Sequence, residues 1–470
     1  MNGQVNLRIL LGCLCIPLTG HAQSKPDSLD RAIRSEMAHQ QIPGLSFAVV
    51  QHGRIVRLGA YGYGNLEWKT PVTRATRFEI ASMSKMFTGT ATRLLVDEGR
   101  LDLEAPLTQF FAGLPDSWRD MKVRHLVTMS AGIPEDWGGE LIPYNADVTT
   151  PYSDSSMLRA HAGLPLTSAV GAEFHYSSPS YHLLGLIASK VSGQPLSQFM
   201  QQAIFGPAGM TRTSFVDNEA IIPDRADGYR RENGIVRRGW FLGQYLHARA
   251  DVGILSTAED QVRWIIALRQ GRIVKDPAVL WTFPPSDSGR FLDYAYGWFN
   301  GTLLGHHMIS HGGRFRTGFR STINVFPDDD VAVVILTNGD WSNVDHLALI
   351  IGRHYLADLP DPESPPADAD PQTTAATIAA LRSVASGRID SSAMLPDALA
   401  PLSLGEASEF LKAVESFTFA GRGRVLRPLQ MHGHQLRDFT SIRLTMGPDF
   451  KIVTIYRDTA ARIAFVEPTQ

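Results

Sequence analysis

The sequence predicts an α+β fold, and three stretches of the chain carry that prediction. Residues 42–63 contain two strand-like runs separated by His52-Gly53, a pair that is typical of a hairpin turn. In residues 86–99, apolar side chains recur at helical spacing until a glycine ends the pattern. Residues 323–336 again contain two strand-like runs, on either side of a turn of proline and aspartates. Strands joined by such short turns pair antiparallel, so we expect an antiparallel sheet with helices in the intervening chain.

The length and composition describe an ordinary globular protein with more than one domain. The chain has 470 residues, of which 44% are hydrophobic and 19% charged, and this length allows two or three domains. Its formal net charge of -3 leaves no basic surplus that could neutralise phosphates. We therefore expect no nucleic acid partner.

The first 22 residues have the pattern of a cleaved signal peptide. Arg8 precedes the apolar run 9–18, and the small-residue site Gly20-His21-Ala22 follows it. A run of this length is too short to span a membrane, so we expect a periplasmic or secreted protein without a transmembrane span in its mature chain. Cleavage after Ala22 would remove both cysteines, and a lipid anchor on Cys13 is the alternative.

A serine and a lysine three positions apart are the strongest chemical signal in the chain. Ser82 and Lys85 lie at the start of the predicted helix, where residues i and i+3 share one face. The lysine amine can therefore reach the serine hydroxyl, which needs an adjacent base to become a nucleophile at neutral pH. We expect Ser82 at the helix N-terminus, where free backbone N–H groups favour developing negative charge.

Together with further segments in a fixed order, this motif makes the sequence resemble the serine β-lactamase and penicillin-binding-protein superfamily. It is most similar to the branch that holds class C β-lactamases, D,D-carboxypeptidases, D-aminopeptidases and family VIII esterases, from about Leu29 to about Asn338. The resemblance implies a β-lactamase/transpeptidase-like fold, in which an antiparallel sheet flanked by helices is joined to a helical subdomain. It rests on the hairpin, Ser82-Met83-Ser84-Lys85, 123–134, 174–185, 204–210, 253–260 and His311-Gly312-Gly313.

The resemblance also implies a proton shuttle. The family's second motif is Tyr-x-Asn, and here it is Tyr176-Ser177-Ser178. Tyr176 is thereby the phenolic partner that moves a proton between Ser82 and the leaving group. Ser178 departs from the pattern, because serine keeps a hydroxyl but lacks the extra donors of an amide. Recognition of substrate by Ser178 is therefore expected to differ from that in the family.

The third motif of the family is Lys-Thr-Gly in β-lactamases and His-x-Gly in several related hydrolases, and here it is His311-Gly312-Gly313. By resemblance His311 polarises the pocket wall, while Gly312 and Gly313 let substrate lie close to the strand. The backbone N–H groups of Ser82 and Arg314 are then the oxyanion hole.

Other chemistries are less well supported by the sequence. His306, His307 and His311 are not accompanied by a His-Glu-x-x-His motif or by cysteine ligands, so we expect no metal. The chain has no Gly-x-Ser-x-Gly elbow and no nucleotide-binding glycine loop, which argues against an α/β-hydrolase and against a nucleotide cofactor.

The domain organisation changes after the helical stretch 344–356. We expect a hydrolase domain over 23–359, a linker rich in proline and aspartate over 360–371, and a small α+β domain over 372–470. The last domain shows two helical patterns and then strand-like runs, among them 433–439 and 441–446. It resembles the helix-plus-curved-sheet appendage, of the nuclear-transport-factor-like kind, of some bacterial members. A stabilising lid, an oligomer contact and a wall-binding module remain open as its role.

These observations predict an exported serine hydrolase that acylates Ser82 and then hydrolyses the acyl-enzyme, without a cofactor. The expected small-molecule substrates are esters or D-amino-acid peptides and amides, and a D-aminopeptidase, a D,D-carboxypeptidase and a β-lactamase are alternatives. A catalytically silent penicillin-recognising or wall-binding protein is the alternative of another class. An unperturbed histidine is mostly neutral at pH 7 and Gly312 has no side chain, so β-lactams, which carry a carboxylate, are expected to be poor substrates.

Overall fold

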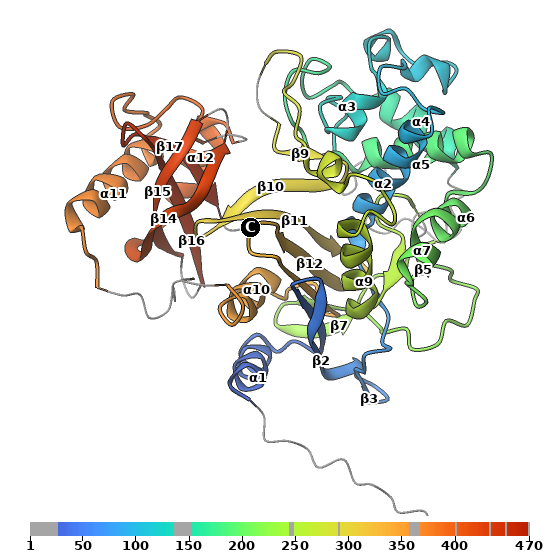
Figure 1. The fold of residues 1–470 in the computed structure, drawn as a ribbon, viewed down its shortest axis with the longest axis horizontal. Coiled ribbons are helices and arrows are strands. Elements are labelled where there is room, and N and C mark those ends of the chain that lie inside the picture. The colour runs from blue at the N-terminus through green and yellow to red at the C-terminus, as the bar shows by residue number, and fades with distance from the viewer. Residues whose placement is uncertain are drawn as a thin grey trace, which may run out of the picture.

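The computed structural model describes residues 27–135, 153–243, 249–289, 292–356, 359, 367–399, 402–431, 434–446 and 449–468. Figure 1 shows two bodies, a larger one and a smaller C-terminal one that contains α11 and α12. The predicted signal peptide, 1–22, and most of the predicted linker, 360–371, lie outside the described residues.

The larger body is built on an eight-stranded antiparallel sheet with the strand order β3-β2-β1-β13-β12-β11-β10-β9. Its first hairpin is the predicted one, and His52 and Gly53 have φ values of 50° and 67°, as a tight hairpin turn requires. β1 pairs on its other side with β13, which places Leu45 opposite Thr337. The strands are β1 (Gly44–Gln51), β2 (Arg54–Asn65), β3 (Thr70–Pro71), β9 (Tyr294–Ala295), β10 (Trp298–Leu303), β11 (His306–Phe315), β12 (Phe319–Phe326) and β13 (Val331–Thr337).

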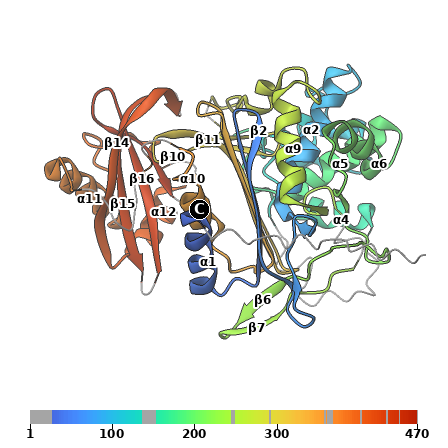
Figure 2. The ribbon, with the colours of Figure 1, turned by 60° about the horizontal axis from the view of Figure 1, so that its bottom comes forward.

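Alternate residues of the central strands point into two different cores. Leu45, Phe47 and Val49 of β1 pack on the side of α1 and α10, whereas Ala48 and Val50 pack on the opposite side. A strand that is buried on both sides is apolar at consecutive positions, which explains the continuous hydrophobic runs of β1 and β13. We call the side turned to α2 and α9 the inner face, and the side turned to α10 and the C-terminal body the outer face (Figure 2).

Helices cover the inner face. The predicted helix is α2 (Ser84–Asp97), and its predicted end is confirmed, because Gly99 follows it with a φ of 68°. Phe87 of α2 packs against Trp264 of α9 with ring centroids 4.2 Å apart, which fixes α2 to a helix that lies on β1 and β13. The helices of this side are α3 (Val123–Val127), α4 (Asp154–Ala162), α5 (Ser178–Ser192), α6 (Leu196–Met200), α7 (Gly206–Ala208) and α9 (Ala258–Arg269).

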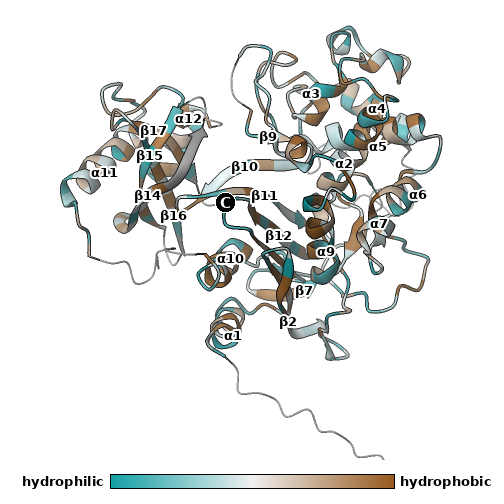
Figure 3. Ribbon diagram, viewed as in Figure 1, coloured by the Kyte–Doolittle hydropathy of each residue, from teal (hydrophilic) through white to brown (hydrophobic). Residues whose placement is uncertain are grey.

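Two helices cover part of the outer face. α1 (Ser28–Gln40) packs against α10 (Val344–Gly352), which is largely hydrophobic in Figure 3 and contacts β12 and β13. In the part of the chain that the structure describes, no helix is both long and apolar enough to cross a membrane. The remaining short strands are β4 (Phe78–Glu79), β5 (Ser214–Phe215), β6 (Tyr229–Glu232), β7 (Ile235–Arg238) and β8 (Ile254–Ser256).

The C-terminal body has its own sheet and core. Its four strands form an antiparallel meander in the order β14-β15-β16-β17, and they share a core with the helices that includes Leu381, Ile442 and Ile455. The elements are α11 (Pro371–Ala385), α12 (Leu404–Lys412), β14 (Ser416–Met431), β15 (His434–Met446), β16 (Asp449–Asp458) and β17 (Ile463–Pro468).

Two sequence predictions for this body are corrected. The strand-like runs 433–439 and 441–446 form the single strand β15, because Thr440 continues the ladder between its neighbours. Pro371 belongs to α11 and not to the linker. Asp370 caps this helix by accepting a hydrogen bond from the backbone N–H of Thr373 at 3.0 Å, and proline suits the first helical position.

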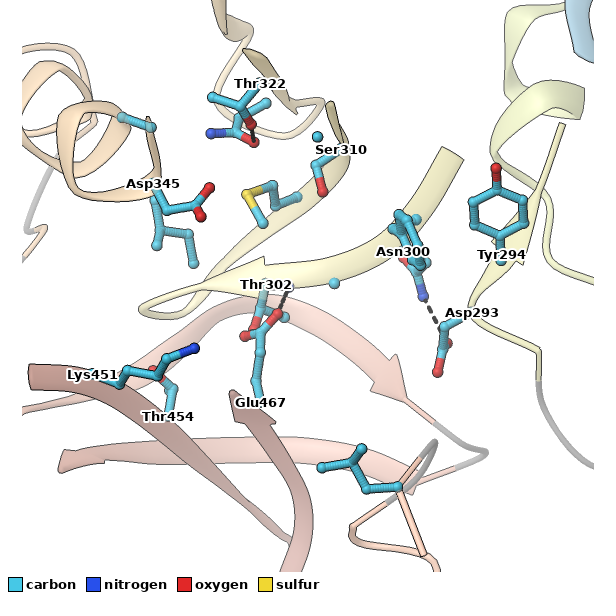
Figure 4. A pocket seen from close by; sticks show the side chains of 18 of the residues that line it. Asp293, Tyr294, Asn300, Thr302, Ser310, Thr322, Asp345, Lys451, Thr454 and Glu467 are labelled. Atoms are coloured by element: carbon cyan, nitrogen blue, oxygen red, sulfur yellow. Dashed lines mark hydrogen bonds between the residues drawn. The ribbon is translucent and has the colours of Figure 1, made fainter. Parts of the chain in front are cut away.

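The C-terminal body contacts the larger body through β10. The carboxylate of Glu467 on β17 accepts hydrogen bonds from the backbone N–H of Thr302, at 2.6 Å, and from the Thr302 hydroxyl. Beside this contact lies a cavity of about 1650 Å³, lined by both bodies. Figure 4 shows Asp345 from α10 and Lys451 from β16 on its walls.

Candidate active site

Ser82 lies in a single 3₁₀ turn, Ala81–Met83, that leads directly into α2. Ser82 thus lies at the N-terminus of this helix, as expected, two positions before its first residue, Ser84. Ala81 has a φ of 49°, a left-handed conformation that costs free energy in a residue other than glycine. The turn holds the predicted pair in contact, because the Lys85 amine donates a hydrogen bond to the Ser82 hydroxyl at 3.1 Å.

Lys85 is wholly buried, and its surroundings are polar. Its amine also donates to the backbone carbonyl of Asp251 at 3.2 Å. Asp251 is buried as well, and its carboxylate is held by the Arg249 guanidinium at 3.0 and 3.1 Å. Burial alone would raise the pKa of Asp251, but the charges of Arg249 and Lys85 lower it. This part of the structure therefore contains buried charges of both signs, with Asp251 between two cations.

Tyr176 lies against the same lysine. The Lys85 amine is 5.0 Å from the centroid of the Tyr176 ring, within the range of a cation–π contact. On its other side the ring stacks on Phe299 of β10, with centroids 6.3 Å apart and an interplanar angle of 6°. Tyr176 directly precedes α5, whose N-cap is Ser177, so the start of this helix fixes the position of the tyrosine.

His311 on β11 is a neutral, doubly hydrogen-bonded imidazole. Its Nδ1 lies 2.6 Å from the carbonyl oxygen of Gly312, which can only accept, so Nδ1 carries the proton. Nε2 then accepts from the Tyr294 hydroxyl at 3.3 Å. Burial, helped by the charge of Lys85, lowers the pKa of His311 to about 3. The ring centroid of His311 is 6.2 Å from that of Tyr176.

The two glycines after His311 face opposite sides of the sheet. A Cβ on Gly313 would lie 2.3 Å from the carbonyl oxygen of Ile80 and 3.2 Å from Cβ of Ala81. A Cβ on Gly312 would find its nearest neighbour at 3.7 Å. Gly313 thus allows β11 to lie directly against the turn of Ser82, and it brings the backbone of Arg314 to the same place.

Ser178 has a partner that the sequence did not indicate. Its hydroxyl donates to the Glu135 carboxylate at 2.8 Å, and its backbone N–H donates to the other carboxylate oxygen. Burial raises the pKa of Glu135, against the opposing charge of Lys85. The residue as a whole is exposed, so the carboxyl group is shielded on the side of Ser178 and open on another. Glu135 directly follows the family-like segment 123–134, but its own position carries no recognisable pattern.

The structure therefore brings Ser82, Lys85, Tyr176 and His311 together, with Ser178 at the first turn of α5 beside them. Sequence reasoning missed Glu135, Arg249, Asp251, Tyr294 and Phe299. Distance along the chain explains part of this, since 166 positions separate Lys85 from Asp251.

The three histidines considered for a metal have separate partners. His306 contacts the Asp329 carboxylate at 2.9 Å, and His307 contacts the Asn300 side chain at 2.9 Å. Among the described residues, no group of three or more His, Cys, Asp and Glu side chains could hold a metal ion.

Comparisons with known proteins agree with this geometry. A model of the Beta-lactamase family matches residues 29–358. Protein flp of Staphylococcus aureus (strain MRSA252) is 27% identical over 339 residues, which cover 68% of this chain and 64% of that protein. A Beta-lactamase of Escherichia coli (strain K12) is 31% identical over 242 residues, which cover 51% of this chain and 60% of that protein. The chain thus spans less than two thirds of the length of both relatives.

One solved structure covers almost the whole chain. The octameric penicillin-binding protein homologue from Pyrococcus abyssi superposes with a TM-score of 0.62 and 21% identity, over 92% of this chain and 96% of that one. This similarity confirms the predicted α+β, β-lactamase/transpeptidase-like fold.

Proposed function

The chain belongs to the beta-lactamase family, and from that premise we propose that it is a serine hydrolase that forms an acyl-enzyme on Ser82. The observation that carries the proposal is the 3.1 Å hydrogen bond between the Lys85 amine and the Ser82 hydroxyl. A buried lysine beside a hydroxyl is an arrangement that activates a nucleophile, either by accepting its proton or by stabilising the alkoxide.

In the proposed reaction the Ser82 oxygen forms a bond to the substrate carbonyl carbon, while the Tyr176 hydroxyl takes the serine proton and passes its own proton on towards the leaving group. The charged Lys85 amine stabilises the serine oxygen in this step. The backbone N–H groups of Ser82 and Arg314 stabilise the oxyanion. The bond to the leaving group then breaks, and the leaving oxygen or nitrogen takes the proton. A water molecule, deprotonated by the same pair, attacks the acyl carbon and releases the acid together with free Ser82.

The preferred substrates are small acyl esters and D-amino-acid peptides or amides. The neutral state of His311 supports this preference over β-lactams, because its pKa of about 3 leaves the imidazole uncharged at neutral pH, at the position where Lys-Thr-Gly proteins have a lysine. An aminopeptidase or carboxypeptidase acting on D-residues fits the same reasoning.

We further propose that the protein is exported to the periplasm or secreted, which rests on the signal-peptide pattern of residues 1–22. N-terminal sequencing of the exported protein should find a chain that begins near Gln23. A lipidated Cys13 would support the lipoprotein alternative, and an active cytoplasmic form that keeps Met1 would contradict export.

Covalent labelling tests the reaction. After treatment with a fluorophosphonate, mass spectrometry should place the adduct on the peptide that contains Ser82. Ser82→Ala, Lys85→Ala and Tyr176→Phe should each remove most turnover, with losses that do not add, because the three groups act as a unit. Ser197→Ala, at an exposed serine of α6, is the matched control. Labelling at another serine, or full activity in Ser82→Ala, would contradict the proposal. A protein that folds but forms no adduct would instead be a silent binding protein.

A further inference from the structure

Glu135 and Ser178 together offer hydrogen-bond acceptors and no free donor. The single hydroxyl hydrogen of Ser178 is directed to the Glu135 carboxylate at 2.8 Å, and the backbone N–H of Ser178 is directed to the other oxygen. An ionised carboxylate only accepts. Glu135 is exposed whereas Ser178 is 3% exposed, so Glu135 is the group that a ligand meets, and Ser178 is the residue that orients it.

This carboxylate lies within electrostatic reach of the reaction centre. The positive charge of Lys85 acts on Glu135, and the negative charge of Glu135 in turn contributes to the raised pKa of Tyr294. Ser178, its partner, is two positions from Tyr176 in sequence. A group bound by Glu135 would therefore be part of the same substrate whose carbonyl meets Ser82.

The charge of Glu135 is not fully compensated in the free protein. Burial raises its pKa in spite of the two bonds from Ser178 and the field of Lys85. A second cation at the carboxylate would stabilise its ionised form. The neutral His311 ring on β11 gives no comparable support to an anion, so the observation that favours a positive substrate group is local to Glu135.

We propose that Glu135, oriented by Ser178, binds a protonated amine on the acyl group of the substrate, which makes amino-acyl esters and amides the preferred class. This inference rests on the proposed function, and it adds a recognition residue that lies outside every motif found in the sequence. Its chemistry is a charge-assisted hydrogen bond between an ammonium group and a carboxylate.

A purely structural role is the alternative. A carboxylate that accepts hydrogen bonds at the start of α5 also stabilises that helix end. Loss of such a contact would disturb Tyr176 and would lower the turnover of all substrates by a similar factor. The two roles therefore predict different ratios of kcat/KM between a substrate with an amine and one without it. A loss of turnover that is equal for both substrates indicates the structural role.

The test uses the full chain and two esters of the same size. D-alanine ethyl ester carries an ammonium group where ethyl isobutyrate carries a methyl group. In the wild-type protein at pH 7, kcat/KM should favour the alanine ester roughly tenfold to a hundredfold, the usual range for a charge-assisted bond. In Glu135→Gln this ratio should fall by roughly tenfold to a hundredfold relative to the wild type, and in Ser178→Ala it should fall partly. Glu219→Gln, which removes an exposed carboxylate from a loop, should keep the wild-type ratio.

The pH dependence gives a second readout that needs no variant. Ammonium binding requires the ionised carboxylate, so the preference for the alanine ester should disappear as the pH falls through the raised pKa of Glu135. Turnover of both esters with a wild-type ratio near one, or an equal loss for both in Glu135→Gln, would overturn the amine site and leave the hydrolase standing. No turnover of either ester and no adduct on Ser82 would overturn the proposed function itself.

Discussion

The two faces of the main sheet differ in how they treat buried charge, although they share the same strands. On the inner face Asp251 is paired with Arg249, and the attraction lowers its pKa. On the outer face the Asp345 carboxylate lies 4.0 Å from the Arg320 guanidinium. Burial raises the pKa of Asp345, against the charges of Arg320 and Lys451. The large cavity is lined mostly by residues of the outer face and of the C-terminal body, but it also reaches Tyr294, Phe299 and Arg314 at the site. The organisation of charge therefore locates the chemistry more narrowly than the cavity does.

Removing one carboxylate charge from each face should give the largest contrast. Asp251→Asn leaves the Arg249 guanidinium buried without its counter-charge, so we expect the free energy of unfolding to fall by about 3–5 kcal/mol. Asp345→Asn removes a charge that the fold already disfavours, so we expect a change within about 1 kcal/mol or a slight gain. Urea unfolding at pH 7 measures both. Equal losses in the two variants would show that the faces do not differ in this respect.

Glu467, on the outer side, should make stability depend on pH. Burial raises its pKa from 4.5 to about 7. Between these values the unfolded chain releases a proton that the folded chain keeps. The free energy of unfolding therefore falls as the pH rises from 4.5 to 7, by up to about 3 kcal/mol in all, and stays low at higher pH.

Glu467→Gln should remove this part of the pH dependence, while Glu409→Gln, at an exposed position of α12, should keep it. Unfolding free energies at pH 5 and pH 8 are the measurement. An unchanged difference between the two pH values in Glu467→Gln would mean that Glu467 titrates normally.

Gly312 and Gly313 of β11 allow the two faces of the sheet to be compared within a single strand. Gly313→Ala places a methyl group 2.3 Å from the Ile80 carbonyl oxygen, so β11 must move away from the Ser82 turn. We expect the free energy of unfolding to fall by about 1–3 kcal/mol. We also expect most of the covalent labelling of Ser82 to be lost. Gly312→Ala meets nothing closer than 3.7 Å, so labelling should persist. Comparable labelling rates in the two variants would contradict the close approach of β11 to Ser82.

Sequence reasoning succeeded where the signal is local. The hairpin of β1 and β2 is marked by its turn residues, and the central strands are marked by continuous apolar runs that burial on two faces requires. Ser82 and Lys85 are three positions apart, so helical spacing alone predicts their contact. The distance of 3.1 Å between the Lys85 amine and the Ser82 hydroxyl agrees with that expectation.

The remaining features depend on folding over long distances. Glu135 meets Ser178 across 43 positions and Lys85 meets Asp251 across 166, and neither pair leaves a pattern within one stretch of sequence. The 3₁₀ turn of Ser82 was also not predictable, because an amphipathic pattern does not distinguish the first turn of a helix from the residues before it. The roles of all the site residues predicted from the sequence, Ser82 and Lys85 included, stay predictions.

The smallest expected effect concerns the ranking of substrates. In Lys-Thr-Gly proteins a lysine charge and a threonine hydroxyl face the carboxylate of the β-lactam, whereas here His311 is neutral and Gly312, on the outer side of β11, has no side chain. The double variant His311→Lys with Gly312→Thr should therefore narrow the gap in kcat/KM between an ester and benzylpenicillin. A charge-assisted bond is commonly worth about 1.5–3 kcal/mol, but burial disfavours a charged lysine at this position.

We accordingly expect a change of roughly tenfold, the lower end of that range. Gly312→Thr alone is the matched control, because the outer side of β11 has room for the side chain and no charge is added. Steady-state kinetics with an acyl ester, a D-amino-acid ester and benzylpenicillin would measure the gap in each protein. If benzylpenicillin were already the best substrate of the wild-type protein, the charge of this wall would not set the ranking. The ranking would then have to depend on the other charged groups near Ser82, such as Lys85 and Glu135.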